Sequence, residues 1–308
     1  MSPSSDLDIR IQPVPPERWA SALELVLSRR PAAERASLMQ WILLGGSKTR
    51  LAGLIGAFSG DQIVGAALAM VMAGRTALVY QPRINPATAP QVASQLWAAI
   101  EDFLDQHQVR LAQEVLPLQA LADAEQTRLA GFSLSTELVY YHRETHASQE
   151  NADSDHLALA PCEPNDQTRL ARVIELTYQG TQDCPELNGV RSTVDVIEGY
   201  LEGRPWDSRC WQFIRVDGQD IGCVLLTMHG EASCELVYLG LIATARGRGL
   251  GRLATQRAIG LGRSLGCSEI TVATDVRNTP ARRAYEQSGF IEFDRRRVLL
   301  KVLGNQSP

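Results

Sequence analysis

The sequence lacks an excess of positive charge. Its 308 residues include 30 Lys and Arg against 35 Asp and Glu, which gives a formal net charge of −5 and a pI near 5.6. Proteins that bind nucleic acid over a broad surface are usually basic on that surface. We therefore expect no nucleic-acid partner, and any basic site must be local.

Long apolar runs are also missing. No uninterrupted run approaches the roughly 20 residues that a membrane-spanning helix needs. The first residues, Met-Ser-Pro-Ser-Ser-Asp, have neither the basic nor the apolar region of a secretion signal. We therefore expect a cytoplasmic protein with no membrane partner.

Cysteine is sparse, and none of the six cysteines is spaced C-x-x-C. A chain of this length does not need disulfide staples, so we expect reduced, mostly structural thiols. A zinc site at Cys223, His229 and Cys234 is an alternative. However, two successive strands carrying Cys223 and Cys234 explain both as small core residues. We expect no metal.

The length suits two ordinary domains. Between Glu144 and His156 the sequence is polar and has no apolar periodicity, which is typical of a solvated connector. We therefore expect an N-terminal domain at 1–145, a linker at 146–155 and a C-terminal domain at 156–308.

Both halves show the same order of expected elements: a short strand, helical sequence, a hairpin, a strand, a long helix, a strand, a helix and a closing strand. The hairpin glycines Gly65 and Gly222 lie 157 positions apart (222 − 65), and the helix-ending glycines Gly131 and Gly289 lie 158 apart (289 − 131). We therefore expect an α+β fold of two repeats, each a mixed, mainly antiparallel sheet flanked by helices.

A glycine-rich and arginine-rich turn joins an expected strand, 235–242, to an expected helix, 251–265. A helix N-terminus offers unpaired backbone N–H groups and a favourable dipole to an anion, and glycines let a phosphate approach the backbone. The dinucleotide fingerprint G-x-G-x-x-G fails, because Arg252 occupies its last position. The turn runs through Arg246, Gly247, Arg248, Gly249, Leu250, Gly251 and Arg252.

This turn resembles the acyl-CoA signature of the GNAT superfamily of N-acetyltransferases, R/Q-x-x-G-x-G/A. Downstream, the segment from Asn278 through Ala281 and Tyr285 to Gly289-Phe290 resembles the second signature of that family. The resemblance is strong over about 211–302 and architectural elsewhere, where it is similar to tandem members such as mycothiol synthase. It implies acetyl-CoA as the acyl donor and an amine as the acceptor.

Two residues are candidates for catalysis. A lysine-like amine has a pKa of about 10.4, so a base must remove a proton before it can attack at neutral pH. Glu235, on the strand entering the turn, is that candidate, and Tyr285 matches the family's general-acid tyrosine. The alternatives are a solvent-facing strand glutamate and a tyrosine packed between helix and sheet.

The resemblance also implies cofactor-binding roles. A backbone N–H near Leu239 is expected to meet the thioester carbonyl, and the strand through Leu241 is expected to pair with the pantetheine arm. Asn278 either contacts that arm or caps its helix. Arg246, Arg248 and Arg252 are expected to neutralise phosphates.

The N-terminal half departs from this pattern. Its corresponding turn, 81–88, has no glycine and two prolines, which remove N–H donors. We expect a degenerate repeat there.

The sequence thus predicts an N-acetyltransferase that moves an acetyl group from acetyl-CoA to a primary amine of a small molecule by direct attack. Acidic Asp183 and Glu186, with Trp206 and Asp207, lie where the family's acceptor loops fall. A non-catalytic acyl-CoA sensor or interaction module, and an acetyltransferase acting on a protein amine, stay open as alternatives.

Overall fold

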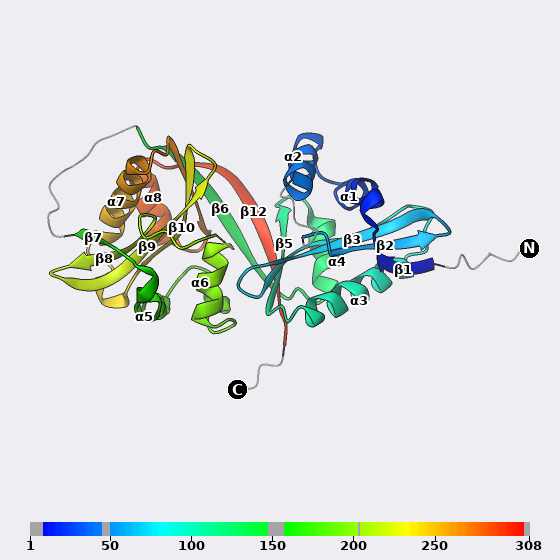
Figure 1. The fold of residues 1–308 in the computed structure, drawn as a ribbon, viewed down its shortest axis with the longest axis horizontal. Coiled ribbons are helices and arrows are strands. Elements are labelled where there is room, and N and C mark those ends of the chain that lie inside the picture. The colour runs from blue at the N-terminus through cyan, green and yellow to red at the C-terminus, as the bar shows by residue number, and fades with distance from the viewer. Residues whose placement is uncertain (1–8, 45–49, 147–156, 203, 305–308) are drawn as a thin grey trace, which may run out of the picture. The chain divides into compact units, whose positions relative to one another are not determined.

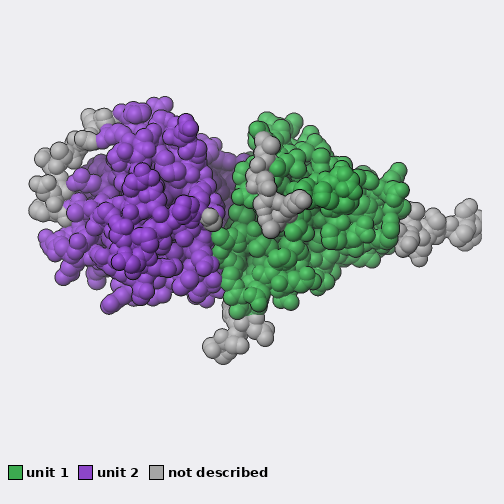
Figure 2. Space-filling view, viewed as in Figure 1, with its two compact units in different colours: residues 1–135, 299–308 green, residues 136–298 purple. Residues whose placement is uncertain are grey.

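The computed structural model describes residues 9–44, 50–146, 157–202 and 204–304. The chain divides into two compact units (Figures 1 and 2), the first comprising residues 1–135 and 299–308 and the second residues 136–298. Residues 147–155 of the expected linker lie outside the described residues. Within those ranges, no helix is long and apolar enough to cross a membrane.

The first unit is a sheet with a core on each face. Its strand order is β1-β2-β3-β4-β5 followed by the end of β12, and only the β4–β5 pair among the first five strands is parallel. Because side chains alternate along β3, Ala67 and Ala69 pack with α3 while Leu68 and Met70 pack with α1. The elements are β1 (Ile9–Pro13), α1 (Trp19–Val26), α2 (Ala32–Leu44), β2 (Gly53–Ser59), β3 (Gln62–Met72), β4 (Thr76–Ile84), α3 (Gln91–Gln106), β5 (Leu111–Pro117) and α4 (Leu121–Leu129).

The second unit repeats this plan. Its strand order is β12-β6-β11-β10-β9-β8-β7, in which β10 and β11 are parallel. One core cluster includes buried side chains of α5 and α7, such as Ile174 and Ala258. The elements are β6 (Leu134–Glu144), β7 (Ala158–Pro161), α5 (Gln167–Tyr178), α6 (Thr193–Leu201), β8 (Trp211–Val216), β9 (Gln219–His229), β10 (Ser233–Leu241), α7 (Leu250–Ser264), β11 (Glu269–Asp275), α8 (Thr279–Gln287) and β12 (Ile291–Val302).

This architecture confirms the expected α+β class of tandem, mainly antiparallel sheets flanked by helices. The compact units differ from the expected domains in their last strands. Most of β6 belongs to the second unit, where it forms an antiparallel ladder with β11 from Leu138↔Asp275 to Glu144↔Glu269. Residues 299–302 of β12 belong to the first unit. Strand periodicity alone does not say which sheet a strand joins, because pairing is long-range.

Candidate active site

The centre of the candidate site is a fork between two parallel strands of the second unit. β10 and β11 pair only as far as Glu235↔Thr271, and a bulge interrupts β10 between Leu236 and Tyr238. Beyond this point β10 continues against β9, and β11 against β6. The facing edges of β10 and β11 thus have no strand partner within the described ranges, which leaves extended backbone for a ligand to pair with. Leu239 and Leu241 both lie on this part of β10.

The glycine-rich turn follows directly. Gly247 and Gly249 have φ values of 74° and 78°, a backbone conformation that suits glycine. Gly249 is the N-cap of α7 and supplies no side-chain cap. Among the described residues, no carbonyl accepts from the N–H groups of residues 250–252, as is usual for the first turn of a helix. The turn therefore presents N–H groups and a positive helix end to an anion.

The three arginines of this turn divide into two roles. The guanidinium of Arg246 donates to the carbonyl oxygens of Leu241 (2.9 Å), Gln179 (2.7 Å), Gly180 (3.1 Å) and Thr177 (2.5 Å). Arg246 therefore ties the end of β10 to the end of α5, and its charge is not directed at a phosphate. Arg248 and Arg252 are exposed on either side of the N-cap, and we assign phosphate neutralisation to these two.

Glu235 lies where the fork opens. Its carboxylate contacts Nε2 of His229 at 3.0 Å, and its side chain is 39% exposed. The preceding Cys234 faces α7, because its Sγ lies beside Gly262 of that helix, so Glu235 projects from the opposite face. Cys223 and Cys234 are buried core residues, and no group of three or more metal-ligating side chains occurs in the described part of the chain.

Tyr285 lies on the helix-covered face of the sheet. It lies on α8, is 5% exposed, and its ring packs against Tyr141 (6.1 Å between centroids) and Phe290 (5.7 Å). Burial raises the pKa of Tyr285 well above its ordinary value, and the nearby Asp183 carboxylate adds to this. The phenol therefore keeps its proton throughout the physiological pH range. Tyr141 pairs with Val272, the neighbour of Thr271, so Glu235 and Tyr285 lie on opposite faces of the sheet.

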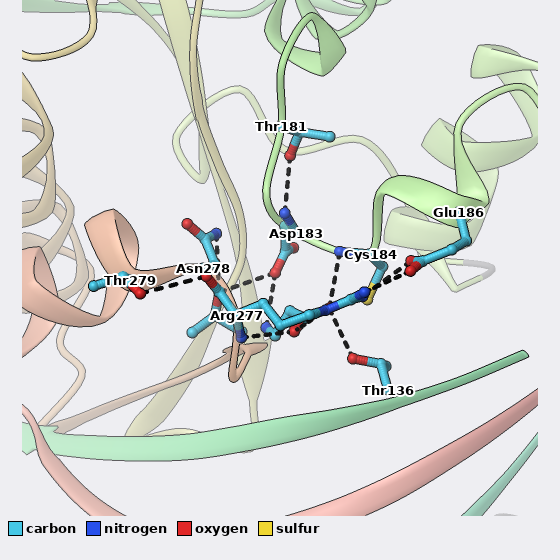
Figure 3. A network of polar contacts seen from close by, with 10 residues as sticks. Thr136, Thr181, Asp183, Cys184, Glu186, Arg277, Asn278 and Thr279 are labelled. Atoms are coloured by element: carbon cyan, nitrogen blue, oxygen red, sulfur yellow. Dashed lines mark hydrogen bonds and ion pairs between the residues drawn. The ribbon is translucent and has the colours of Figure 1, made fainter.

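A buried carboxylate at the end of β11 organises the surroundings of the site (Figure 3). Asp275 is fully buried and accepts hydrogen bonds from Thr136 Oγ1 (2.7 Å), the Cys184 N–H (3.2 Å) and the Arg277 guanidinium (2.6 Å from Nη2). Arg277 also pairs with Glu186 at 2.5 Å. The network holds the loop between α5 and α6 against β11.

Two of the predicted residues take part in these contacts. Asp183 accepts from the Asp275 N–H (2.8 Å) and from Thr274 Oγ1 (2.9 Å). Asn278 caps α8 by accepting from the Ala281 N–H at 3.4 Å, and its amide donates to Thr274 Oγ1 at 3.2 Å. Asp183 and Asn278 therefore position the loop and the helix in this structure.

The other predicted acceptor residues are held elsewhere. Trp206 donates to the Cys162 carbonyl at 2.7 Å, and Asp207 pairs with Arg209 at 2.7 Å. Sequence reasoning did not identify Asp275 or Arg277, and it considered His229 only as a zinc ligand, because the contacts of these residues are made by the folded chain.

Replacing Asp275 with Asn should make the protein less stable at neutral pH. Burial alone would raise the pKa of Asp275, but hydrogen bonds from Arg277 and Thr136 lower it from 3.8 to about 2. A lowered folded-state pKa adds stability that is complete above about pH 4 and is lost as the pH falls towards 2. We expect Asp275→Asn to lower the free energy of unfolding by about 2 kcal/mol at pH 7.

Urea unfolding of Asp275→Asn and of the exposed control Asp61→Asn at pH 7 and pH 3 measures this effect. The difference in free energy of unfolding between wild type and Asp275→Asn should be smaller at pH 3 than at pH 7. A difference that is the same at both values would contradict the proposed charge network.

The first unit has the same fork, but side chains fill it. Its parallel pair ends at Leu78↔Gln113, offset by 157 and 158 positions from Glu235↔Thr271 (235 − 78; 271 − 113). Just beyond, the buried Glu114 carboxylate accepts from the Gln81 N–H (3.2 Å), from its side-chain amide (3.3 Å) and from Thr127 Oγ1. We call Gln81, Glu114 and Thr127 the polar plug.

The polar plug takes the positions that a ligand would need. The N–H of Gln81, on the edge of β4, is already bonded to Glu114. Thr127 stands 158 positions before Tyr285 (285 − 127), at the corresponding place on α4. Beside the plug, Asp123 forms a bidentate pair with Arg83 (3.0 and 2.5 Å). That the first unit is a degenerate repeat stays a prediction, and these contacts give it a physical reason.

Comparison with known proteins gives a family match over part of the chain and similar folds over most of it. Residues 175–290 match the model of the Acetyltransferase (GNAT) family. The fold is similar to a GCN5-related N-acetyltransferase from Sphaerobacter thermophilus (TM-score 0.61, 14% identity, 96% of this chain and 95% of that chain covered). It is also similar to a tandem GNAT protein from the clavulanic acid biosynthesis pathway (TM-score 0.55, 14% identity, 97% and 100% covered). Comparison with curated proteins gives no significant sequence match.

Proposed function

We propose that this chain is an acetyltransferase that moves an acetyl group from acetyl-CoA to a primary amine of a small molecule, because residues 175–290 match the GNAT family model and the whole chain has the fold of tandem GNAT proteins. The observation that carries this proposal is the continuity of the fork with the glycine-rich turn. Both lie on one stretch of backbone, from Glu235 to Arg252. Acetyl-CoA suits such a site, because its phosphates can bind at the start of the helix and its extended, amide-containing arm can pair with the strand edge.

In the proposed reaction Glu235 removes a proton from the bound ammonium group, and the free amine attacks the thioester carbonyl carbon. A backbone N–H near Leu239 stabilises the negative charge on the carbonyl oxygen. The carbon–sulfur bond then breaks, and Tyr285 donates its proton to the departing thiolate. His229, in contact with Glu235, provides a polar path from the carboxylate towards solvent.

One feature favours a small acceptor over a protein. The loop between α5 and α6 is fixed to β11 by the Asp275 network, so it does not move aside readily for a protein segment. The polar plug supports acetyl-CoA binding in the second unit alone. We also propose that the protein acts in the cytoplasm.

Tyr285→Phe should lower kcat by about a hundredfold, because general-acid catalysis contributes on the order of 10² or more. Acetyl-CoA affinity should change little, because the ring remains in its packed position. Tyr80→Phe is the matched control, since Tyr80 is similarly buried (7% exposed) but lies in the first unit. Steady-state kinetics of both variants measure this effect. An equal fall in kcat in the two variants would contradict the proton-donor role of Tyr285.

The proposed function is tested by measuring thiol release from acetyl-CoA with the full-length protein over a panel of primary amines. Release that depends on a small amine supports it. Acetyl-CoA binding without release on any amine favours the sensor. Release with peptide amines alone favours a protein acceptor.

A further inference from the structure

A patch of aromatic side chains lies on the sheet of the second unit. Phe293 of β12 is 57% exposed. Its ring meets Tyr140 at 6.3 Å between centroids and His142 at 5.6 Å, both edge-on, and these two residues lie on β6. We call Tyr140, His142 and Phe293 the aromatic patch. An exposed phenylalanine anchored by two neighbouring rings offers a firm apolar contact to a ligand.

The aromatic patch is on the same face of the sheet as Glu235. His142 stands opposite Thr271, and Thr271 stands opposite Glu235, so the three form one row across β6, β11 and β10. Residues in register point to the same face. Burial and then the charge of Glu235 raise the pKa of Tyr140, which places this ring within electrostatic range of the candidate base.

The charges around the patch are mainly negative. Glu235 and Glu269 are 39% and 46% exposed, and each contacts one histidine, His229 at 3.0 Å and His142 at 3.3 Å. Arg296 of β12 pairs with Asp294 at 2.6 Å. Carboxylates beside exposed ring faces are complementary to an ammonium group with an apolar body.

We propose that the acceptor is a primary amine carrying an aromatic or similarly bulky apolar group, which rests against Phe293 while its ammonium group reaches Glu235. This inference rests on the proposed function and names the class of its acceptor. The ammonium form is attracted by Glu235 and Glu269. Acetylation converts it to a neutral amide, so the product loses that attraction and leaves more readily.

The test compares 2-phenylethylamine with n-butylamine as acceptors for the full-length protein, with acetyl-CoA saturating. We expect kcat/KM to be about tenfold higher for 2-phenylethylamine, the effect of partly burying one ring. Phe293→Ala should remove this preference by raising KM for 2-phenylethylamine about tenfold, with little change for n-butylamine. Phe293→Tyr retains the ring and should retain the preference.

Leu129→Ala is the control, because Leu129 is 80% exposed but belongs to α4 in the first unit. It should change neither amine's kinetics. Thermal unfolding should be the same for wild type and both Phe293 variants, since this side chain is exposed.

The possible outcomes separate the acceptor class from the function itself. Equal turnover of the two amines, or a preference unaffected by Phe293→Ala, overturns the aromatic class and leaves the acetyltransferase proposal standing. A peptide amine turned over at least tenfold better than both also overturns it. Binding of acetyl-CoA with no turnover of any amine overturns both.

Discussion

Glu235→Gln is expected to lower kcat/KM for amine acetylation by two to three orders of magnitude, the size of effect associated with losing a general base. Glutamine keeps the shape and the contact with His229 but cannot take up a proton. Glu235 lies at the last position where β10 pairs with β11, away from the turn. Acetyl-CoA affinity should therefore stay within about twofold of wild type, since no phosphate contact is touched.

The pH dependence gives a second readout. In wild type, Glu235 accepts the proton of the bound ammonium group, so the reaction does not depend on amine that is already neutral. In Glu235→Gln the remaining rate should rise steeply with pH, because only the amine fraction that is already neutral can react. Glu231→Gln, on the exposed turn before β10, is the matched control. Equal losses in both variants, or a weaker acetyl-CoA complex in Glu235→Gln, would show that Glu235 is not the base.

Gly249→Val is expected to weaken acetyl-CoA binding by about a hundredfold. Gly249 has φ 78°, and a β-branched residue is strained in that region. A Cβ there meets no protein atom within 4 Å, so the added side chain points into the open space where a phosphate is proposed to lie. Strain in the turn and obstruction of the N–H groups act in the same direction.

Calorimetric titration with acetyl-CoA measures this loss. Gly260→Ala is the control on the same helix, because a Cβ at Gly260 also meets open space and its backbone is not in the left-handed region. Its affinity should match wild type. If Gly249→Val binds as tightly as the control, the anion site is not at the start of α7.

The fold and the glycine-rich turn could be predicted because their signals are local. The glycine and arginine spacing of residues 246–252 lies on one strand-to-helix connection, and the repeat is visible as two nearly equal offsets. Gly247 and Gly249 then adopt positive φ, as a turn of this kind requires.

Other features could not be predicted, since they arise from contacts between distant residues. The spacing of the motif places Arg246 in the turn, but its guanidinium donates hydrogen bonds to the carbonyl oxygens of Gln179 and Gly180. The polar plug joins β4, β5 and α4, and nothing local marks Glu114 as buried. The placement of β6 beside β11 likewise follows from strand pairing across the chain.

The difference between the two forks is the physical reason for expecting acetyl-CoA to bind to one unit only. In the second unit no described strand pairs with the β11-facing edge of β10 beyond Glu235, and the turn after it carries glycines. In the first unit the burial of Glu114 raises its pKa, and its hydrogen bonds with Thr127 and Gln81 oppose that rise while closing the gap. Binding of acetyl-CoA and chemistry should therefore be confined to the second unit.

Calorimetric titration of the full-length protein with acetyl-CoA tests this claim most directly. We predict saturable binding with a stoichiometry of one acetyl-CoA per chain. Two equivalents per chain would show that the first fork also binds, in contradiction to the polar plug, and no binding at all would contradict the assignment of the fork and the glycine-rich turn as the acyl-CoA site.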